Sequence, residues 1–367
     1  MPAQLSLPRR ISLSSPTSEA SMVSRKAETP SAYVEGGYDK GGHAYGSSSG
    51  SAVGVSAGFG AVALGTDSSG ALVCPASRAA LYAIRLPVGM IPGSGIVPIS
   101  YTTDTVGPLA FTPADAAIML DVLSGSDGKY HRAAEAPKMA GLRFGLVRRN
   151  FFDEANGLSP LVGTSVHSAK TMEEVMAKMR QAGAEVFDVS MDIDAVDCEE
   201  LADARQDIFR SDINEDMNQY LCQLKESPVR TLAELVEWNQ DHADEELPPK
   251  APEQDNFIKA LSAPPRDSDE YRRLNARVAD IAVKRGMDYI FEKYNLDAAL
   301  FITEFELSYV IVGAAGYALG TAPMGYRADG APFGISFAVK PNEKEKLISI
   351  LSGYEAIMPQ RRVPEWL

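Results

Sequence analysis

Residues 46–76 read GSSSGSAVGVSAGFGAVALGTDSSGALVCPA, and this stretch decides the fold that we predict. It begins with glycine and serine, which suit tight turns and close backbone approach, since glycine tolerates positive φ and serine bonds local backbone groups. A strand candidate follows at residues 61–64 and ends in the turn-rich residues 65–70. The apolar pair Leu72 and Val73 then leads into Pro75.

Downstream of this stretch the sequence alternates between helical and strand patterns. Thr112 has the residue type of a helix N-cap, and a helix is expected from there through Leu123. A strand is expected at 142–147, an amphipathic helix at 171–181 and a second strand at 185–187. This β-α-β rhythm favours a mixed or parallel sheet covered by helices.

The C-terminal half is predicted in less detail. In chain order we expect a helical stretch at 229–262 interrupted by an acidic loop at 241–249, a helix at 268–294, a buried strand at 296–300, a glycine-rich stretch at 313–334, a strand at 335–339 and a helix from Lys344. We expect residues 35–367 to form one domain, behind a disordered tail at residues 1–34.

The tail is rich in serine, proline and basic residues, a composition also found in transit peptides. Prolines at positions 2, 8 and 16 would break the long amphipathic helix of such a peptide, so a plain tail is the simpler interpretation. We therefore expect a cytoplasmic protein, with organelle targeting through the basic N-terminus as the alternative.

Composition excludes several functional classes. The hydrophobic fraction is 45% and the charged fraction 23%, as in soluble globular proteins. A net charge of −14 argues against nucleic acids and acidic membranes as partners, because polyanions would be repelled. The cysteines (Cys74, Cys198 and Cys222) and the four histidines are too few and too scattered for a disulfide framework or a metal site. We expect no cofactor and no metal.

The motifs in residues 46–76 resemble those of the amidase-signature family, which includes amidases and the A subunits of glutamyl-tRNA amidotransferases. The family pattern is a GGSSGGS-like loop, a small-residue helix, a strand ending in GTD, and a turn of the type GGS-x-R-x-P-A. The similarity continues through residues 107–123, 231–239 and 316–334, so it covers about residues 36 to 358. It implies the family's α/β/α sandwich with a mixed central sheet, here lacking its N-terminal portion.

The resemblance also implies site residues. Members of the family are C–N hydrolases with a Lys, cis-Ser, Ser triad, in which a weak hydroxyl nucleophile is activated by a neighbouring base. Ser47 falls at the cis-serine position, and Ser68, Ser69, Gly70 and Ala71 map to the oxyanion turn. The position of the attacking serine is occupied by Ala71, which has no hydroxyl and cannot form an acyl-enzyme.

Two further positions depart from the family pattern. The arginine two residues after the nucleophile is Val73. The triad lysine lies upstream of the cis-serine in a segment like G-x-P-x-x-V-K-D, and no such segment precedes Ser47. Lys40 lies in a glycine-rich loop, where a solvated lysine is the simpler interpretation.

Other nucleophiles and bases are open to consideration. Ser68 or Ser69 could serve as a displaced nucleophile, although near-attack geometry tolerates little error. Cys74 lies in an apolar run, where an inert buried thiol is the simpler interpretation. His43 lies close in sequence to residues 46–51, which we call the serine loop, but it has no visible orienting partner in the sequence.

We therefore expect an amidase-like protein whose hydrolytic activity is impaired. The alternatives are an active hydrolase or another catalyst using different groups in the same cleft, and a truncated or inactivated form of an ordinary amidase. A small amide or acyl ligand is the expected partner. A protein partner or self-association could cover the face that a missing N-terminal portion would expose.

Overall fold

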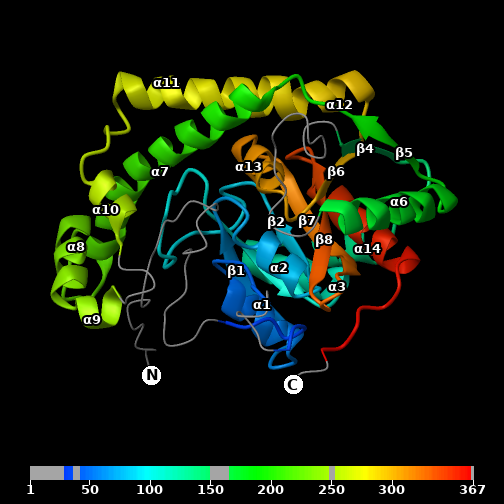
Figure 1. Ribbon diagram of the computed structural model, residues 1–367, viewed down its shortest axis with the longest axis horizontal. Helices are drawn as coiled ribbons and strands as arrows, with labels where there is room; N and C mark the ends of the chain where they lie inside the picture. Colours follow the sequence, from blue (N-terminus) through cyan, green and yellow to red (C-terminus); the bar gives the residue numbers. More distant parts are fainter. Residues whose placement is uncertain (1–28, 36–41, 149–164, 248–252, 365–367) are drawn as a thin grey trace.

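The computed structural model describes residues 29–35, 42–148, 165–247 and 253–364, which include one eight-stranded sheet (Figure 1). The strand order across the sheet is β1-β3-β2-β7-β8-β6-β4-β5. Strand β4 pairs in parallel with β5 and β6, and the other pairs are antiparallel. The strands are β1 (Val62–Asp67), β2 (Tyr82–Arg85), β3 (Thr105–Ala110), β4 (Arg143–Val147), β5 (Glu185–Val189), β6 (Ala298–Ile302), β7 (Ala318–Tyr326) and β8 (Pro332–Val339).

Helices cover both faces of this sheet. A Cβ on Gly320 of β7 would meet Leu351 of α14, whereas a Cβ on Gly334 of β8 would meet Ser77 of α2. Gly320 is directly opposite Phe337 in the neighbouring strand, so the two positions share one face of the sheet. Side chains alternate between the faces along a strand, and Phe337 and Gly334 are an odd number of residues apart, so Gly334 is on the other face. The contacts with α14 and α2 are therefore on opposite faces of the sheet. The helices nearest the sheet are α1 (Ser49–Ser56), α2 (Val73–Arg78), α3 (Pro113–Ser124), α4 (Lys129–Ala134), α6 (Ser165–Gln181), α13 (Glu306–Ala314) and α14 (Lys344–Ile357).

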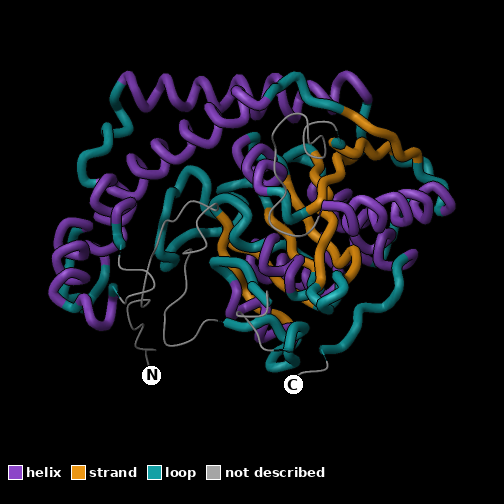
Figure 2. Tube along the Cα trace, viewed as in Figure 1, coloured by secondary structure: helices purple, strands orange, loops and turns teal. Residues whose placement is uncertain are grey.

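A set of longer helices runs along one side of this body (Figures 1 and 2). Helix α7 and the helix formed by α11, η3 and α12 lie beside each other, and the short helices α8, α9 and α10 gather at the end distant from β5. Their bounds are α7 (Ala195–Gln223), α8 (Leu232–Asp241), α9 (Ala243–Glu246), α10 (Asp255–Ala260), α11 (Asp269–Val278), the π-helical η3 (Ala279–Met287) and α12 (Asp288–Tyr294). Helix α7 connects this set to the site described below.

The α/β/α sandwich with a mixed sheet is confirmed, and so are most of the predicted elements. Strands β4, β5, β6 and β8 and helices α3 and α14 lie where the sequence patterns placed them, with boundary shifts of a few residues. Thr112 is the N-cap of α3, where its side chain accepts a hydrogen bond from the backbone of Asp115. The stretch 268–294 is one continuous helix whose middle is π-helical.

Three predictions need correction. The acidic stretch was expected to be a loop, but residues 243–246 form α9, because acidic side chains are compatible with a first helical turn. The glycine-rich stretch 313–334 contains β7, whose glycines are accommodated where neighbouring side chains pack closely. Residues 31–34 are buried, so packing begins within the segment that was assigned to the tail. Residues 1–28 lie outside the described part of the chain.

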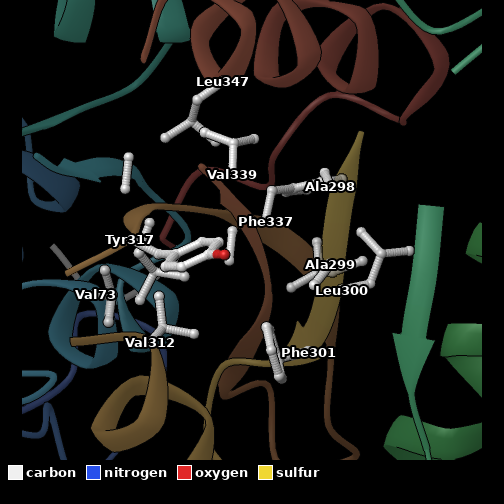
Figure 3. Close-up of a cluster of buried hydrophobic side chains, with 14 of the residues drawn as sticks. Val73, Ala298, Ala299, Leu300, Phe301, Val312, Tyr317, Phe337, Val339 and Leu347 are labelled. Atoms are coloured by element: carbon white, nitrogen blue, oxygen red, sulfur yellow. The ribbon is translucent and has the colours of Figure 1, made fainter. Parts of the chain in front are cut away.

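The main core lies between β8 and α14, where Phe337 is fully buried. Its ring makes edge contacts with Phe144 and Tyr354, at centroid distances of 6.3 and 5.2 Å. Figure 3 shows Phe337 among side chains from β6, β8, α13 and α14, including Ala298, Val312 and Leu347. Such a ring fills space that smaller side chains cannot fill.

We predict that Phe337→Ala lowers the free energy of unfolding by about 3–5 kcal/mol, because the substitution removes a buried ring and leaves a cavity. The measurement is urea unfolding followed by circular dichroism. Phe59→Ala is the matched control, since Phe59 is 87% exposed and its loss should change stability by less than about 0.5 kcal/mol. Equal losses for the two variants would contradict the assignment of the core.

Candidate functional site

The turn that follows β1 is built around the carboxylate of Asp67, which is fully buried. One of its oxygens, Oδ1, accepts hydrogen bonds from the backbone N–H of Gly70 at 2.9 Å and from Nε of Arg85 at 3.1 Å. The other oxygen accepts from the backbone N–H of Leu72 at 2.9 Å. Two alternate amides of residues 69–72 are therefore bound to one carboxylate, and Arg85 supplies its counter-charge.

The remaining two amides of the same turn are available. Among the residues that the structure describes, none accepts a hydrogen bond from the backbone N–H of Ser69 or of Ala71. The carbonyl groups of the same two peptide units are engaged, since Ser68 O accepts from Nη2 of Arg205 at 3.2 Å and Gly70 O accepts from the N–H of Cys74 at 2.9 Å. Two such N–H groups are the donors that stabilise a carbonyl oxygen or an oxyanion.

The serine loop lies against this turn. The peptide bond between Gly46 and Ser47 is cis, the form that the resemblance implies for this position. The N–H of Ser48 donates to the carbonyl of Ala71 at 3.0 Å, and its hydroxyl bonds both the N–H and the carbonyl of Thr66, at 3.1 and 3.2 Å. The fold thus brings the residue after Ser47 into direct contact with Ala71.

Close approach of this loop requires glycine at position 65. A Cβ there would lie 2.6 Å from Oγ of Ser48 and 2.7 Å from a methyl carbon of Leu72. Any larger residue would push the serine loop away from β1. The GTD motif at the end of β1 therefore serves packing through Gly65 and hydrogen bonding through Asp67.

The other sequence candidates are less favourably placed for nucleophilic chemistry. Ser68 is 8% exposed, and its hydroxyl donates to Asp104. Cys74 is buried, and burial raises the pKa of its thiol well above the ordinary value, so the thiolate does not form. His43 forms an isolated bridge with Pro30. Lys40 lies outside the described residues.

Asp104 connects the turn to the loop before β3. One carboxylate oxygen accepts from the hydroxyl of Ser68, and the other accepts from the backbone N–H groups of Ile99 and Ser100, at 2.7 and 3.0 Å. Burial raises the pKa of this carboxyl from 3.8 to about 6. A carboxyl group that titrates near neutral pH therefore lies one hydrogen bond from the turn.

The same loop is fastened to the outer helices. Asp212 of α7 accepts hydrogen bonds from the hydroxyls of Ser100 and Thr102, and also bonds Arg266 and Tyr271. The position of the loop beside the turn is therefore set by helices that lie outside the sheet.

Sequence reasoning missed four residues of this site. Asp104 left no signal, because it lies in a loop more than thirty residues after the turn that it contacts. Asp67 was noted within the GTD motif, but its structural role was not identified. Arg85 left a signal, since a charged residue inside an apolar strand usually has a buried partner. Arg205 left none, because nothing in the sequence of α7 indicates that this arginine contacts a turn more than a hundred residues earlier in the chain.

Two features, a metal-binding cluster and a membrane-spanning helix, are absent from the described part of the chain. It contains no group of three or more His, Cys, Asp or Glu side chains arranged to hold a metal ion. It also has no helix that combines the length and the apolar character needed to cross a membrane.

Comparison with known proteins identifies one family. The family model described as "Amidase" matches residues 14–348. An Arabidopsis thaliana protein named "Probable amidase" is 29% identical over 332 residues, covering 88% of this chain. The A subunit of glutamyl-tRNA(Gln) amidotransferase from Geotalea daltonii is 33% identical over 156 residues, covering 40% of this chain and 30% of that protein.

A solved structure shows the same fold. The native peptide amidase from Stenotrophomonas maltophilia superposes with a TM-score of 0.77 at 26% identity, covering 92% of this chain and 73% of that one. The chain spans between 56% and 62% of the length of three curated relatives that match most of it.

We predict that Asp104→Asn removes a pH-dependent part of the stability. The native carboxyl binds its proton more tightly than the unfolded one, so its contribution is largest below about pH 4 and is lost as the pH rises to about 6. A shift of about two pKa units corresponds to about 3 kcal/mol. The side-chain oxygen of asparagine can accept hydrogen bonds from the backbone N–H groups of Ile99 and Ser100, and its NH₂ group can donate to the hydroxyl of Ser68. The variant therefore keeps these hydrogen bonds and removes only the titrating group.

Urea unfolding of both proteins between pH 4 and pH 7 checks this prediction. The free energy of unfolding of the native chain minus that of the variant should fall across this range. A difference that stays constant would show that Asp104 does not titrate as the geometry implies.

Proposed function

The chain belongs to the amidase family, and from this premise we propose that it binds an amide or acyl ligand at the turn of residues 68–71 without hydrolysing it. The observation that carries the proposal is Ala71, whose N–H has no acceptor among the described residues and whose side chain is a methyl group. The site keeps the donors that would hold an acyl oxygen and lacks the hydroxyl that would attack the carbonyl carbon. The proposal rests on residue 71 and does not depend on the identity of the base that the family's triad uses.

The scaffold around this position supports ligand binding. Asp67 and Arg85 hold the turn from inside the fold, and Ser48 holds the carbonyl of Ala71 from the serine loop. An arrangement of this kind keeps its donors fixed whether or not residue 71 is a nucleophile, since every one of these bonds involves the backbone of the turn or Asp67. Binding and attack are therefore separable in this site.

A second candidate function is hydrolysis by a displaced nucleophile, and one contact favours it. The hydroxyl of Ser68 donates to Asp104, a carboxyl that could accept its proton, and burial raises the pKa of that carboxyl to about 6. Against it, Ser68 is 8% exposed, which leaves little room for a substrate carbonyl beside its oxygen. We rank this candidate second.

We predict that the native chain forms no covalent adduct with an alkyl fluorophosphonate and releases no aniline from aryl amides. Ala71→Ser should form an adduct on residue 71 only slowly, and its amide hydrolysis should stay near the native background. The residues before Ser47 contain no segment like the one that carries the triad lysine, and in other hydrolases the loss of one catalytic group costs about as much as the loss of the whole set. Intact-mass and peptide-mass spectrometry locate the adduct.

Ser68→Ala and Ser69→Ala on the native background are the matched controls. An adduct on either serine of the native chain, or native hydrolysis that Ser68→Ala abolishes, would contradict the leading proposal and establish the second candidate.

A further inference from the structure

Arg205 of α7 reaches the turn from a helix that lies more than a hundred residues further along the chain. Its Nη2 donates to Ser68 O at 3.2 Å. That carbonyl belongs to the same peptide unit as the N–H of Ser69, one of the two available donors. A hydrogen bond from a cation to the carbonyl polarises the peptide, so the N–H at its other end becomes a stronger donor.

The charge of Arg205 is buried and lacks a close counter-charge. The residue is 5% exposed, and no carboxylate of the described residues lies within ion-pair distance of it. The guanidinium stacks on the ring of Phe209 at 4.9 Å. Burial, together with the positive charge of Arg85, lowers its pKa to about 10, so it is still a cation at neutral pH.

The two acidic groups at the turn are occupied by other donors. Asp67 accepts from Gly70, Leu72 and Arg85. Asp104 accepts from the hydroxyl of Ser68 and from two backbone amides. Asp67 and Asp212 attract the charge of Arg205 through space but neither is hydrogen-bonded to it, so a negative oxygen at the N–H groups of Ser69 and Ala71 would add a further counter-charge.

We propose that Arg205 is a positioning residue that makes the turn bind a carboxylate in preference to the neutral amide of the same acid. It acts through the Ser68–Ser69 peptide and need not touch the ligand, in keeping with its burial. The ligand class is thus a carboxylic acid, the product class of amide hydrolysis. This inference rests on the proposed function, because it takes the N–H groups of Ser69 and Ala71 to be the donors that hold the ligand.

Fluorine NMR titrations with 4-fluorophenylacetate and 4-fluorophenylacetamide test this preference, since the two probes differ in charge and hardly in shape. We expect the native chain to bind the carboxylate about tenfold or more tightly than the amide. Arg205→Met should bring this ratio close to one, mainly by weakening carboxylate binding. Arg210→Met is the matched control on the same helix, because Arg210 pairs with Asp207, and it should leave the ratio unchanged.

Three results would overturn the inference: no binding of either probe by the native chain, a native ratio near one, or an equal loss of both affinities in Arg205→Met. The last result would indicate a purely structural role. Arg205→Gln is a second neutral variant if Arg205→Met fails to fold, and Arg205→Lys should recover part of the preference by restoring the charge.

The same spectra separate this inference from the proposed function. Conversion of 4-fluorophenylacetamide to the acid by the native chain would appear as a growing carboxylate signal, which would contradict the proposed function alone. The ratio of affinities at early times would still report on Arg205.

Discussion

The buried carboxylate of Asp67 is the group on which the rest of the site depends. It accepts hydrogen bonds from two alternate amides of the turn and from Arg85, and none of its atoms is exposed. Removing one partner from a buried ion pair typically costs about 3–5 kcal/mol, because the other charge is left unpaired. Because Asp67 engages the amides of Gly70 and Leu72, the amides of Ser69 and Ala71 are left for a ligand. The availability of two donors is thus a consequence of one buried acid.

Much of this could be predicted from the sequence, and the reason lies in local signals. The GTD strand end, the serine loop and the turn that contains Ala71 are contiguous patterns, so their order identified the fold and the candidate positions. The glycine-rich stretch before β8 concealed β7, because glycine weakens a strand pattern even where close packing against α14 requires it. Arg205 and Asp104 join the turn through contacts between residues distant in sequence, and no local pattern reports such contacts.

The hydrogen bonds that shape the turn do not depend on the residue at position 71. The turn depends on Asp67, Arg85 and Ser48, and none of these interactions involves the side chain at position 71. Under the proposed function, alanine at this position leaves the donors in place and supplies no hydroxyl. Membership of the family accounts for the scaffold, whereas the residues of the turn decide the chemistry, since function depends on the site more than on the fold.

The most direct test of the account is the response of the four turn amides to a carboxylate. Backbone ¹H–¹⁵N spectra of the chain would be recorded while 4-fluorophenylacetate is added. The account predicts that the amide protons of Ser69 and Ala71 shift downfield on binding, and that those of Gly70 and Leu72, which are bonded to Asp67, change much less. Equal shifts of all four amides, or shifts confined to Gly70 and Leu72, would contradict it.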